Sequence, residues 1–335
     1  MFDANFFLTA LVVVLALVFD FINGFHDTAN AIATSISTRA LKPRVAIVLA
    51  STMNLVGALA FTGVAKTIGG KIANPFALDN GLYIVTAALV AAIVWNLITW
   101  YYGIPSSSSH ALIGSLVGGV LAAAGFSAVN FKGFVSILEA LIFSPILAFV
   151  TGYLVMSLIK IVFYRAHPVK INRRFRTLQV FTAAWQAFSH GTNDAQKSMG
   201  IITFALIAGG FQQEMEIQYW VKICAALAMA LGTSFGGWKI IKTVGSRIIK
   251  IEPANGFAAD FTSASVILMA TLLKLPVSTT HVISSSIMGV GAAKRFHAVK
   301  WGTAQKIVTA WLITLPITIV LAAMVYMLMD LLLPI

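Results

Sequence analysis

The stretch Phe25-His26-Asp27-Thr28-Ala29-Asn30 decides the fold, because it places a carboxylate and an imidazole inside an apolar region that runs from Phe6 to Ile36. Two further polar or flexible residues, Asn23 and Gly24, precede it. An ionisable group at the centre of a membrane costs at least about 2.5 kcal/mol, so such groups usually face a cavity, a partner or an ion path. We therefore expect this window to be a functional site within the membrane. The alternative is a solvated loop between two short helices.

The same window recurs in the second half of the chain as Ser189-His190-Gly191-Thr192-Asn193-Asp194-Ala195-Gln196-Lys197-Ser198. Aligning the two windows places Asp27 on Asp194. A second matched pair is Ile104-Pro105-Ser106-Ser107-Ser108-Ser109-His110 and Leu275-Pro276-Val277-Ser278-Thr279-Thr280-His281. Two polar interruptions in the same order, at nearly the same spacing, predict that the chain is a duplicated membrane protein.

The composition agrees with a membrane location. Hydrophobic residues make up 59% and charged residues 10% of the 335, with a mean hydropathy of +0.90, whereas soluble domains carry about 25% charge. The first apolar run lacks a basic leader and a small-residue cleavage site, so we expect it to be retained. Cys224 is the single cysteine, which excludes an intrachain disulfide and a cysteine-based metal site.

The apolar spans predict an all-α polytopic protein with about 10–12 membrane segments. We expect a first transmembrane repeat over 1–163, a basic cytoplasmic connector over 164–177 and a second repeat over 178–335. The spans lie near 6–36, 45–65, 82–102, 106–125 and 134–163, and again near 178–208, 220–238, 257–274, 277–293 and 302–333. The segments 106–125 and 277–293 are either full spans or the return limbs of re-entrant hairpins.

The Lys and Arg residues predict the orientation. Cytoplasmic loops carry an excess of these residues, so the connector from Arg165 to Arg176 is expected inside the cell and both termini outside. The net charge of +12 is then an orientation signal and not evidence of nucleic-acid binding. An odd number of crossings in each half inverts the second repeat relative to the first. Inverted repeats with matching broken helices are typical of secondary transporters whose site lies at the membrane midplane, so we expect the four polar windows to converge on one cavity.

The hydroxyl runs that follow Pro105 and Pro276 predict an anion site. Proline suits the first turn of a helix, and hydroxyl donors beside a helix N-terminus suit a tetrahedral oxyanion. The alternative is that the hydroxyls bond back to their own helices. The expected anion ligands are Ser106, Ser107, Ser108, Ser109, Ser278, Thr279 and Thr280.

Asp27 and Asp194 fit a coupling cation better than an anion, because ionised carboxylates repel an anion. With Asn30 and Asn193 they offer hard oxygen donors for Na⁺, and a desolvated carboxylate can equally carry a proton. A structural role in capping a broken helix is the alternative. Lys197 either pairs with Asp194, three residues earlier on the same helix face, or attracts the anion directly.

Several other polar residues in apolar spans have two interpretations each. Four histidines either pack and hydrogen-bond between helices or serve as proton-transfer and gating groups: His26, His110, His190 and His281. Asn54 and Asn96 are expected to form interhelical hydrogen bonds.

These motifs resemble the inorganic phosphate transporter (PiT) family, whose duplicated signature centres on Gly-Ala-Asn-Asp-x-x-Asn. The match is to the bacterial branch, through Asn23–Asn30, Ser189–Lys197, Pro105–His110 and Pro276–His281, and it covers essentially the whole chain. The resemblance implies a multi-pass protein of the cytoplasmic membrane, surrounded by lipid, that transports inorganic phosphate by symport with Na⁺ or H⁺. It implies no other cofactor, and it implies a homodimer.

Two departures from the signature leave alternatives open. His26 replaces the first Asn and Lys197 the last Asn of the second copy, so H⁺ coupling or transport of a metal–phosphate complex competes with Na⁺ coupling, in which Asp27 and Asp194 would ligate Na⁺. Sulfate is an alternative oxyanion, and a passive anion channel an alternative mode. An intramembrane hydrolase using Ser109 and His110 is disfavoured, because neighbours on a helix point about 100° apart. We therefore expect that the protein is not an enzyme.

Overall fold

The protein is built from α-helices, as the apolar periodicity predicts. The structure, a computed structural model, describes residues 4–71, 78 and 80–332, without the side chains of residues 4, 28–30, 69–71 and 168. Those residues contain no β-strand, which confirms the all-α class. Helices suit a chain in a bilayer because each satisfies its own backbone hydrogen bonds.

The helices follow the ten predicted spans, with one additional short helix in each half that was not predicted separately. In the first half these are α1 (Ala4–Ser37), α2 (Pro43–Ala60), α3 (Gly63–Lys71), α4 (Gly81–Tyr102), α5 (Ser108–Ala124) and α6 (Phe131–Val162). In the second half they are α7 (Pro168–Ala208), α8 (Tyr219–Phe235), α9 (Trp238–Lys242), the π-helical turn η3 (Thr243–Arg247), α10 (Pro253–Leu272), α11 (Thr279–Lys294) and α12 (Trp301–Leu332). Short 3-10 turns precede α6 and α12 at Phe126–Ala128 and Phe296–Ala298.

Five of the described helices, α1, α2, α4, α6 and α12, are long and apolar enough to cross a membrane. The total of about 10–12 membrane segments stays a prediction. α7 begins at Pro168, within the predicted connector 164–177, because the missing N–H and fixed φ of proline suit a first helical turn. The division into repeats and connector stays a prediction.

Two of the four polar windows, 104–110 and 275–281, coincide with breaks between helices, and the other two do not. α1 runs unbroken through residues 23–30, and α7 runs unbroken through residues 189–198. Asp27 and Asp194, one in each window, accept hydrogen bonds from hydroxyls of other helices while the backbone of their own helices stays closed. The bent segment of the second half lies instead between Phe235 and Trp238, where the helix axis turns by 63°.

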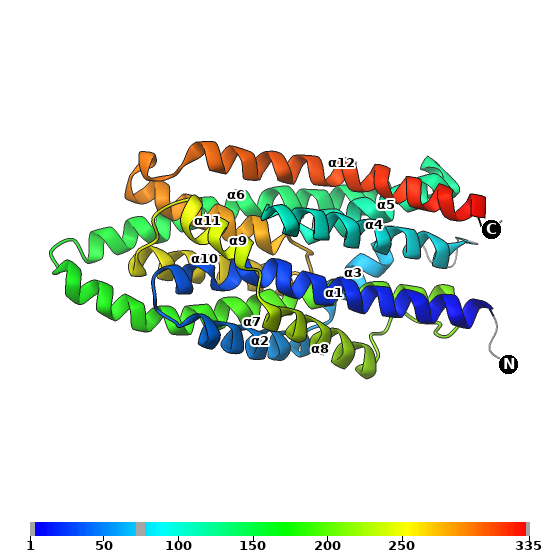
Figure 1. Ribbon diagram of the computed structural model, residues 1–335, viewed down its shortest axis with the longest axis horizontal. Coiled ribbons are helices and arrows are strands. Elements are labelled where there is room, and N and C mark those ends of the chain that lie inside the picture. The colour runs from blue at the N-terminus through cyan, green and yellow to red at the C-terminus, as the bar shows by residue number, and fades with distance from the viewer. Residues whose placement is uncertain (1–3, 72–77, 79, 333–335) are drawn as a thin grey trace.

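Two helix pairs turn back in the middle of the molecule. Figure 1 shows α4 running inward from the end where α1 begins and α12 ends, and α5 returning to that end. The α10–α11 pair enters from the opposite end, where α6 meets α7, and also returns. Pro105, Ser106 and Ser107 at one tip, and Pro276, Val277 and Ser278 at the other, are buried. This arrangement favours re-entrant hairpins over full spans.

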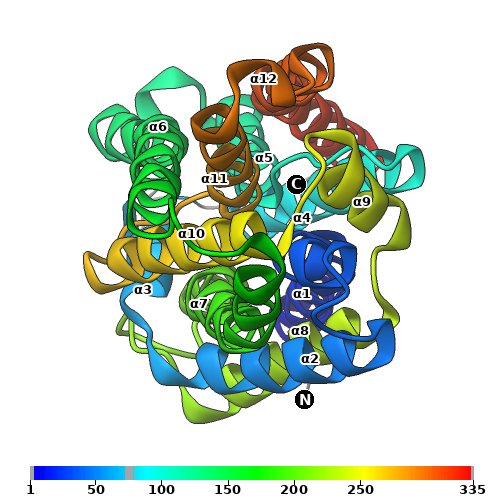
Figure 2. The ribbon, with the colours of Figure 1, turned by 90° about the vertical axis from the view of Figure 1, so that its left-hand side faces the viewer.

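The helices form two groups, with one limb of each hairpin lying between them. Viewed along the long axis, α1, α2, α7 and α8 lie together, α5, α6, α11 and α12 lie on the other side, and α4 and α10 lie between (Figure 2). One apolar cluster includes Val12, Phe19 and Met199, and a second includes Ile32 and Ala187. The polar windows of α1 and α7 therefore lie between two apolar cores.

Helices of the first half pack closely against helices of the second. A Cβ on Gly24 in α1 would lie 2.4 Å from the Met229 carbonyl oxygen in α8, and one on Gly191 in α7 would lie 2.3 Å from the Asn54 carbonyl oxygen in α2. The same exchange links Gly118 in α5 to α12 and Gly289 in α11 to α6. These glycines are needed for close helix approach, as is common in membrane proteins.

Candidate functional site

Asp27 on α1 lies where the two hairpin tips meet. Its Oδ2 accepts a hydrogen bond from the Ser108 hydroxyl of the first hairpin at 2.6 Å. Its Oδ1 accepts one from the Thr280 hydroxyl of the second hairpin at 2.9 Å. His26 Nδ1 lies 2.7 Å from the same oxygen, and His26 Nε2 lies 3.2 Å from the Thr99 hydroxyl of α4. One buried carboxylate thus connects three parts of the chain.

Asp194 on α7 occupies the equivalent position beside the second hairpin. Its Oδ2 accepts a hydrogen bond from the Thr279 hydroxyl at 2.8 Å, and its Oδ1 accepts one from the Lys197 ammonium group. His190 Nε2 lies 3.1 Å from Oδ2, within ion-pair distance but at an angle unsuited to a hydrogen bond. Lys197 and Asp194 are both fully buried. The predicted pairing of Lys197 with Asp194 is therefore present in the structure.

The two hairpins present their hydroxyls in the same pattern. Ser108 bonds Asp27 as Thr279 bonds Asp194. Ser107 and Ser278 are the N-caps of α5 and α11 and accept hydrogen bonds from the backbone N–H groups of the histidines three residues later. The partial positive charge at each helix N-terminus therefore points toward the carboxylates, which it stabilises.

The remaining predicted hydroxyls have other partners. The Ser106 hydroxyl donates to the Thr99 hydroxyl at 2.8 Å, and the Ser109 hydroxyl donates to the Val277 carbonyl of the opposite hairpin tip at 3.0 Å. Of the seven expected anion ligands, Ser108, Thr279 and Thr280 bond directly to the two central carboxylates. The other four shape or link the hairpin tips.

The asparagines differ in what they contact. Asn193 Nδ2 donates to the Thr271 hydroxyl at 3.1 Å and the Leu275 carbonyl at 3.2 Å, and Asn193 Oδ1 accepts from the Val277 N–H at 3.3 Å. Asn193 thus holds the second hairpin, and its role as a cation ligand stays a prediction. The side chain of Asn30 lies outside the described residues.

The two predicted interhelical asparagines gave opposite outcomes. Asn54 on α2 confirms the prediction, with its Oδ1 3.2 Å from His190 Nδ1 and its Nδ2 donating to the Thr233 hydroxyl at 3.0 Å. For Asn96 on α4 the prediction was wrong. Its side chain is fully buried, and neither amide atom has a hydrogen-bond partner among the described residues.

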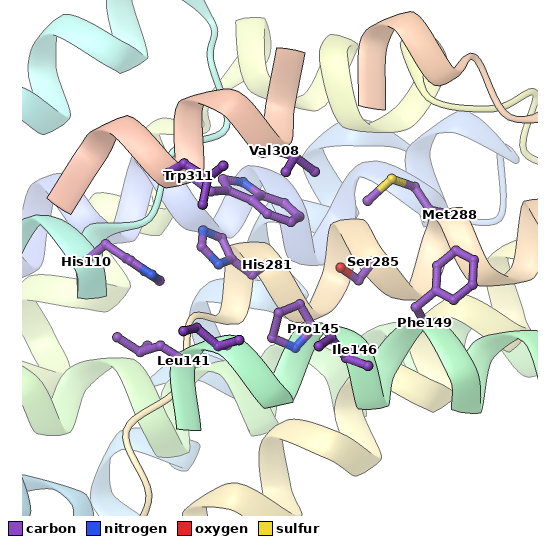
Figure 3. Close-up of a pocket in the computed structure, with 12 residues that line it drawn as sticks. His110, Leu141, Pro145, Ile146, Phe149, His281, Ser285, Met288, Val308 and Trp311 are labelled. Atoms are coloured by element: carbon purple, nitrogen blue, oxygen red, sulfur yellow. The ribbon is translucent and has the colours of Figure 1, made fainter. Parts of the chain in front are cut away.

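The other histidine pair lies to one side of the carboxylates. The rings of His110 and His281 are 4.5 Å apart, and the His281 ring stacks on Trp311 at 4.0 Å. Figure 3 shows both histidines beside an apolar cavity of about 380 Å³ between α6 and α12. His110 Nδ1 lies 2.9 Å from the Ser107 hydroxyl, so the histidine is not paired with Ser109 as a hydrolase would need.

The central carboxylates also form a group that can hold a cation. Ligand atoms of Asp27, His190 and Asp194 lie within 4.8 Å of one another. Two carboxylates and one imidazole offer the oxygen and nitrogen donors that a metal ion uses. The sequence identified both aspartates as cation ligands, but for His190 it indicated only helix packing and hydrogen bonding, or proton transfer and gating. Thr99 and Thr271, which hold the limbs of the hairpins, carried no signal in the sequence, because single threonines are ordinary in membrane helices.

Known proteins resemble the chain over nearly its whole length. The sequence profile of the phosphate transporter family matches residues 23–174 and again residues 165–322. The chain is 59% identical over 329 residues to a probable low-affinity inorganic phosphate transporter of Bacillus subtilis, covering 98% of this chain and 99% of that one. It is 45% identical to a protein of the same description from Rhizobium meliloti, covering 95% and 96% of the two chains.

A solved structure described as "The sodium-dependent phosphate transporter" superimposes with a TM-score of 0.90 at 26% identity, covering 98% of this chain and all of the other. The relatives carry transporter descriptions, in agreement with the expectation that the chain is not an enzyme. Together with the apolar helices, these matches make the chain a multi-pass protein of the cell membrane, and it belongs to the phosphate transporter family.

Proposed function

We propose that the protein is a symporter that carries inorganic phosphate across the cytoplasmic membrane together with Na⁺ or H⁺. The observation that carries this proposal is the convergence of hydroxyls from both hairpins on two buried aspartates. Ser108, Thr279 and Thr280 all donate to Asp27 or Asp194. These are the residues that we assign to phosphate, with Lys197 as the nearby positive charge.

The shared hydroxyls suggest how anion and cation binding are coupled. A hydroxyl has one proton to donate, so Ser108 cannot serve Asp27 and an incoming phosphate oxygen at once. A cation on Asp27 and Asp194 would satisfy the carboxylate oxygens and release the hydroxyls for phosphate. Cation and phosphate would then bind together, and each would raise the affinity of the other by the same factor.

The charge balance requires the same co-transport. Burying an unpaired ion is far more costly than burying a neutralised one. Among the described residues, Lys197 is the one lysine bonded to the central carboxylates, and it is already paired with Asp194. Phosphate would add negative charge to two aspartates, so a cation bound at Asp27 is needed to offset it. Asn30 and Asn193 are the further candidate oxygen donors.

The arrangement of the halves supports alternating access. We propose that residues 1–163 and 178–335 are inverted repeats joined by the basic connector at 164–177, on the cytoplasmic side. The hairpins enter from opposite ends and meet at Asp27 (Figure 1). Withdrawal of one hairpin tip would open the site to its own end of the molecule while the other tip stays closed. This is the behaviour expected of transporters with inverted repeats.

Two further properties remain proposals. A metal–phosphate complex is the second candidate cargo, because His190 beside the two carboxylates makes a donor group suited to a divalent ion. Phosphate is expected to be preferred over sulfate, because phosphate at neutral pH can donate a hydrogen bond to Asp27 or Asp194, whereas sulfate has no proton to donate. The proposed functional unit is a homodimer in lipid.

The test is uptake of radiolabelled phosphate into proteoliposomes at fixed pH, with and without an inward cation gradient. Gradient-driven accumulation is expected for the wild type, and Asp27→Asn is expected to abolish it while phosphate exchange survives. Phosphate uptake that has the same rate and the same final level with and without the cation gradient would indicate a passive channel and contradict the proposal. Replacing Na⁺ with choline identifies the ion, since undiminished uptake excludes sodium. Added Mg²⁺ that is taken up in proportion to phosphate would identify the metal complex as the cargo.

A further inference from the structure

Asp20 is a buried carboxylate that the proposed site does not use. It lies on α1 two turns before Asp27 and is fully buried, and neither of its carboxylate oxygens has a hydrogen-bond partner among the described residues. An isolated carboxylate in a membrane helix is costly, so it normally faces an ion path or a partner. Asp20 therefore needs a positive partner that the described side chains do not supply.

Three other side chains near Asp20 are equally unsatisfied. Asn23 follows three residues later on the same face of α1, and Ser198 of α7 faces the Asp20 carboxylate. Both are fully buried, and neither the two amide atoms of Asn23 nor the Ser198 hydroxyl makes a hydrogen bond of normal geometry in the described part of the chain, although Ser198 lies close enough to interact with the Asp20 carboxylate. Such groups are rare in folded proteins, where buried polar atoms are nearly always paired.

Asn96 of α4 joins this group through the packing of two parallel helices. α1 and α4 both run from the end where α1 begins toward the middle of the molecule (Figure 1). His26 on α1 contacts Thr99 on α4 at 3.2 Å. Asn23 precedes His26 by three residues, and Asn96 precedes Thr99 by three residues. Because the two helices run parallel, Asn23 and Asn96 lie at the same height along the pair. The unpaired amide of Asn96, which the sequence assigned to an interhelical bond, thus lies level with the unpaired amide of Asn23.

The chemistry of this group matches a monovalent cation. Asp20, Asn23, Asn96 and Ser198 supply only oxygen donors, namely carboxylate, amide carbonyl and hydroxyl, which suit hard cations. One carboxylate balances a single positive charge, whereas Ca²⁺ sites use six to eight oxygens and usually several carboxylates. The donors also come from α1, α4 and α7, the helices that position Asp27, Thr99 and Asp194.

A second buried carboxylate shows the contrast. Asp260 on α10 is also buried, but its Oδ1 accepts from the Thr34 hydroxyl at 2.6 Å and its Oδ2 accepts from Gln179 Nε2 at 3.3 Å. Its partners are neutral side chains of α1 and α7, and both oxygens are satisfied. Burial alone therefore does not account for the unpaired oxygens of Asp20.

We propose that Asp20, Asn23, Asn96 and Ser198 form a second cation site, which binds Na⁺ on the side of Asp27 nearer the beginning of α1. The site is distinct from the group of Asp27, His190 and Asp194. It deepens the proposed symport and rests on it for its role, because an ion held here lies within electrostatic range of Asp194 and Lys197. A site that is filled before phosphate arrives would offset part of the negative charge of the central carboxylates.

The test is equilibrium binding of ²²Na⁺ to the purified protein in lipid nanodiscs, in phosphate-free buffer at fixed pH. Asp20→Asn is expected to lower the saturating amount by one ion per chain, and Ser198→Ala is expected to weaken the same ion at least several-fold. Asp260→Asn is the matched control, since it removes a buried carboxylate whose oxygens are already bonded, and it is expected to bind as much Na⁺ as the wild type.

Folding is checked separately by thermal unfolding. Asp20→Asn removes an unpaired buried charge, so its melting temperature without Na⁺ is expected to equal or exceed that of the wild type. Unchanged Na⁺ stoichiometry in Asp20→Asn, or an equal loss in Asp260→Asn, would overturn the assignment. Either result would remove the second cation site. The proposed phosphate transport would still stand if the wild type accumulates phosphate in the separate uptake assay.

Discussion

The two central aspartates occupy corresponding positions but are held by different partners. Asp27 receives hydroxyls from both hairpins, Ser108 and Thr280, and lies beside His26. Asp194 receives one hairpin hydroxyl, from Thr279, and is neutralised by Lys197 of its own helix. The duplication therefore provides a nearly symmetric frame, whereas a lysine in one copy makes its charge asymmetric. Asp194 has a permanent counter-ion, whereas Asp27 has no lysine or arginine partner among the described residues and, under the proposed symport, would be neutralised by the co-transported cation.

The largest expected effect comes from removing that permanent counter-ion. Lys197→Met leaves Asp194 buried beside His190 without its ammonium partner, and breaking a buried pair in this way costs about 3–5 kcal/mol. We expect a lower melting temperature and loss of phosphate uptake. The double variant Lys197→Met/Asp194→Asn removes both charges and should recover most of the stability. A single variant as stable as the wild type would contradict the asymmetry.

A second prediction tests the symmetric part of the comparison. Gly24→Ala and Gly191→Ala each place a methyl group against a backbone carbonyl of the other half, at 2.4 and 2.3 Å before relaxation. Overpacking of this kind costs about 1–3 kcal/mol, and we expect similar losses of thermal stability at the two positions. Gly302→Ala is the control, because a Cβ there has no atom within 4 Å. A large difference between Gly24 and Gly191 would show that the two packings are not equivalent.

The smallest expected effect concerns the helix caps. Ser107 and Ser278 accept hydrogen bonds from the N–H groups of His110 and His281 at 3.1 and 3.2 Å. Replacing an N-cap serine with alanine costs about 0.5–2 kcal/mol. Thermal unfolding of Ser107→Ala and Ser278→Ala should show matching small decreases, comparable to that of Asn130→Ala at the N-cap of α6. Unchanged thermal stability in both serine variants would contradict a structural role for these helix caps.

Much of the fold could be predicted from the sequence because membrane helices are read from uninterrupted hydropathy. The predicted spans 82–102 and 134–163 differ from α4 and α6 by no more than a few residues. The helix breaks could not be predicted in the same way. The polar residues of 23–30 suggested an opened backbone, but whether side chains from other helices satisfy them depends on tertiary packing. Ser108 and Thr280 reach Asp27 from distant parts of the chain.

The candidate site was predicted in part for a similar reason. Repetition identified Asp27, Asp194 and both hydroxyl runs, since matched polar interruptions are rare in apolar segments. It did not identify Asp20 or Ser198, because neither has a counterpart of its own type in the other half. A residue without a counterpart in the other half cannot be found by comparing the two halves. That such a residue is buried without a hydrogen-bond partner is visible only in the structure.

The central claim is that both hairpins contribute donors to one phosphate site. The most direct measurement is equilibrium binding of radiolabelled phosphate to Ser108→Ala, Thr280→Val and the double variant in saturating Na⁺, with Ser265→Ala as the control, because the Ser265 hydroxyl bonds only to the Phe261 carbonyl of its own helix. Each lost donor should weaken binding by about 1–3 kcal/mol, or roughly 5- to 150-fold, and because both contact Asp27 the two losses should not add. Unchanged phosphate affinity in the variant of either hairpin would contradict a shared site.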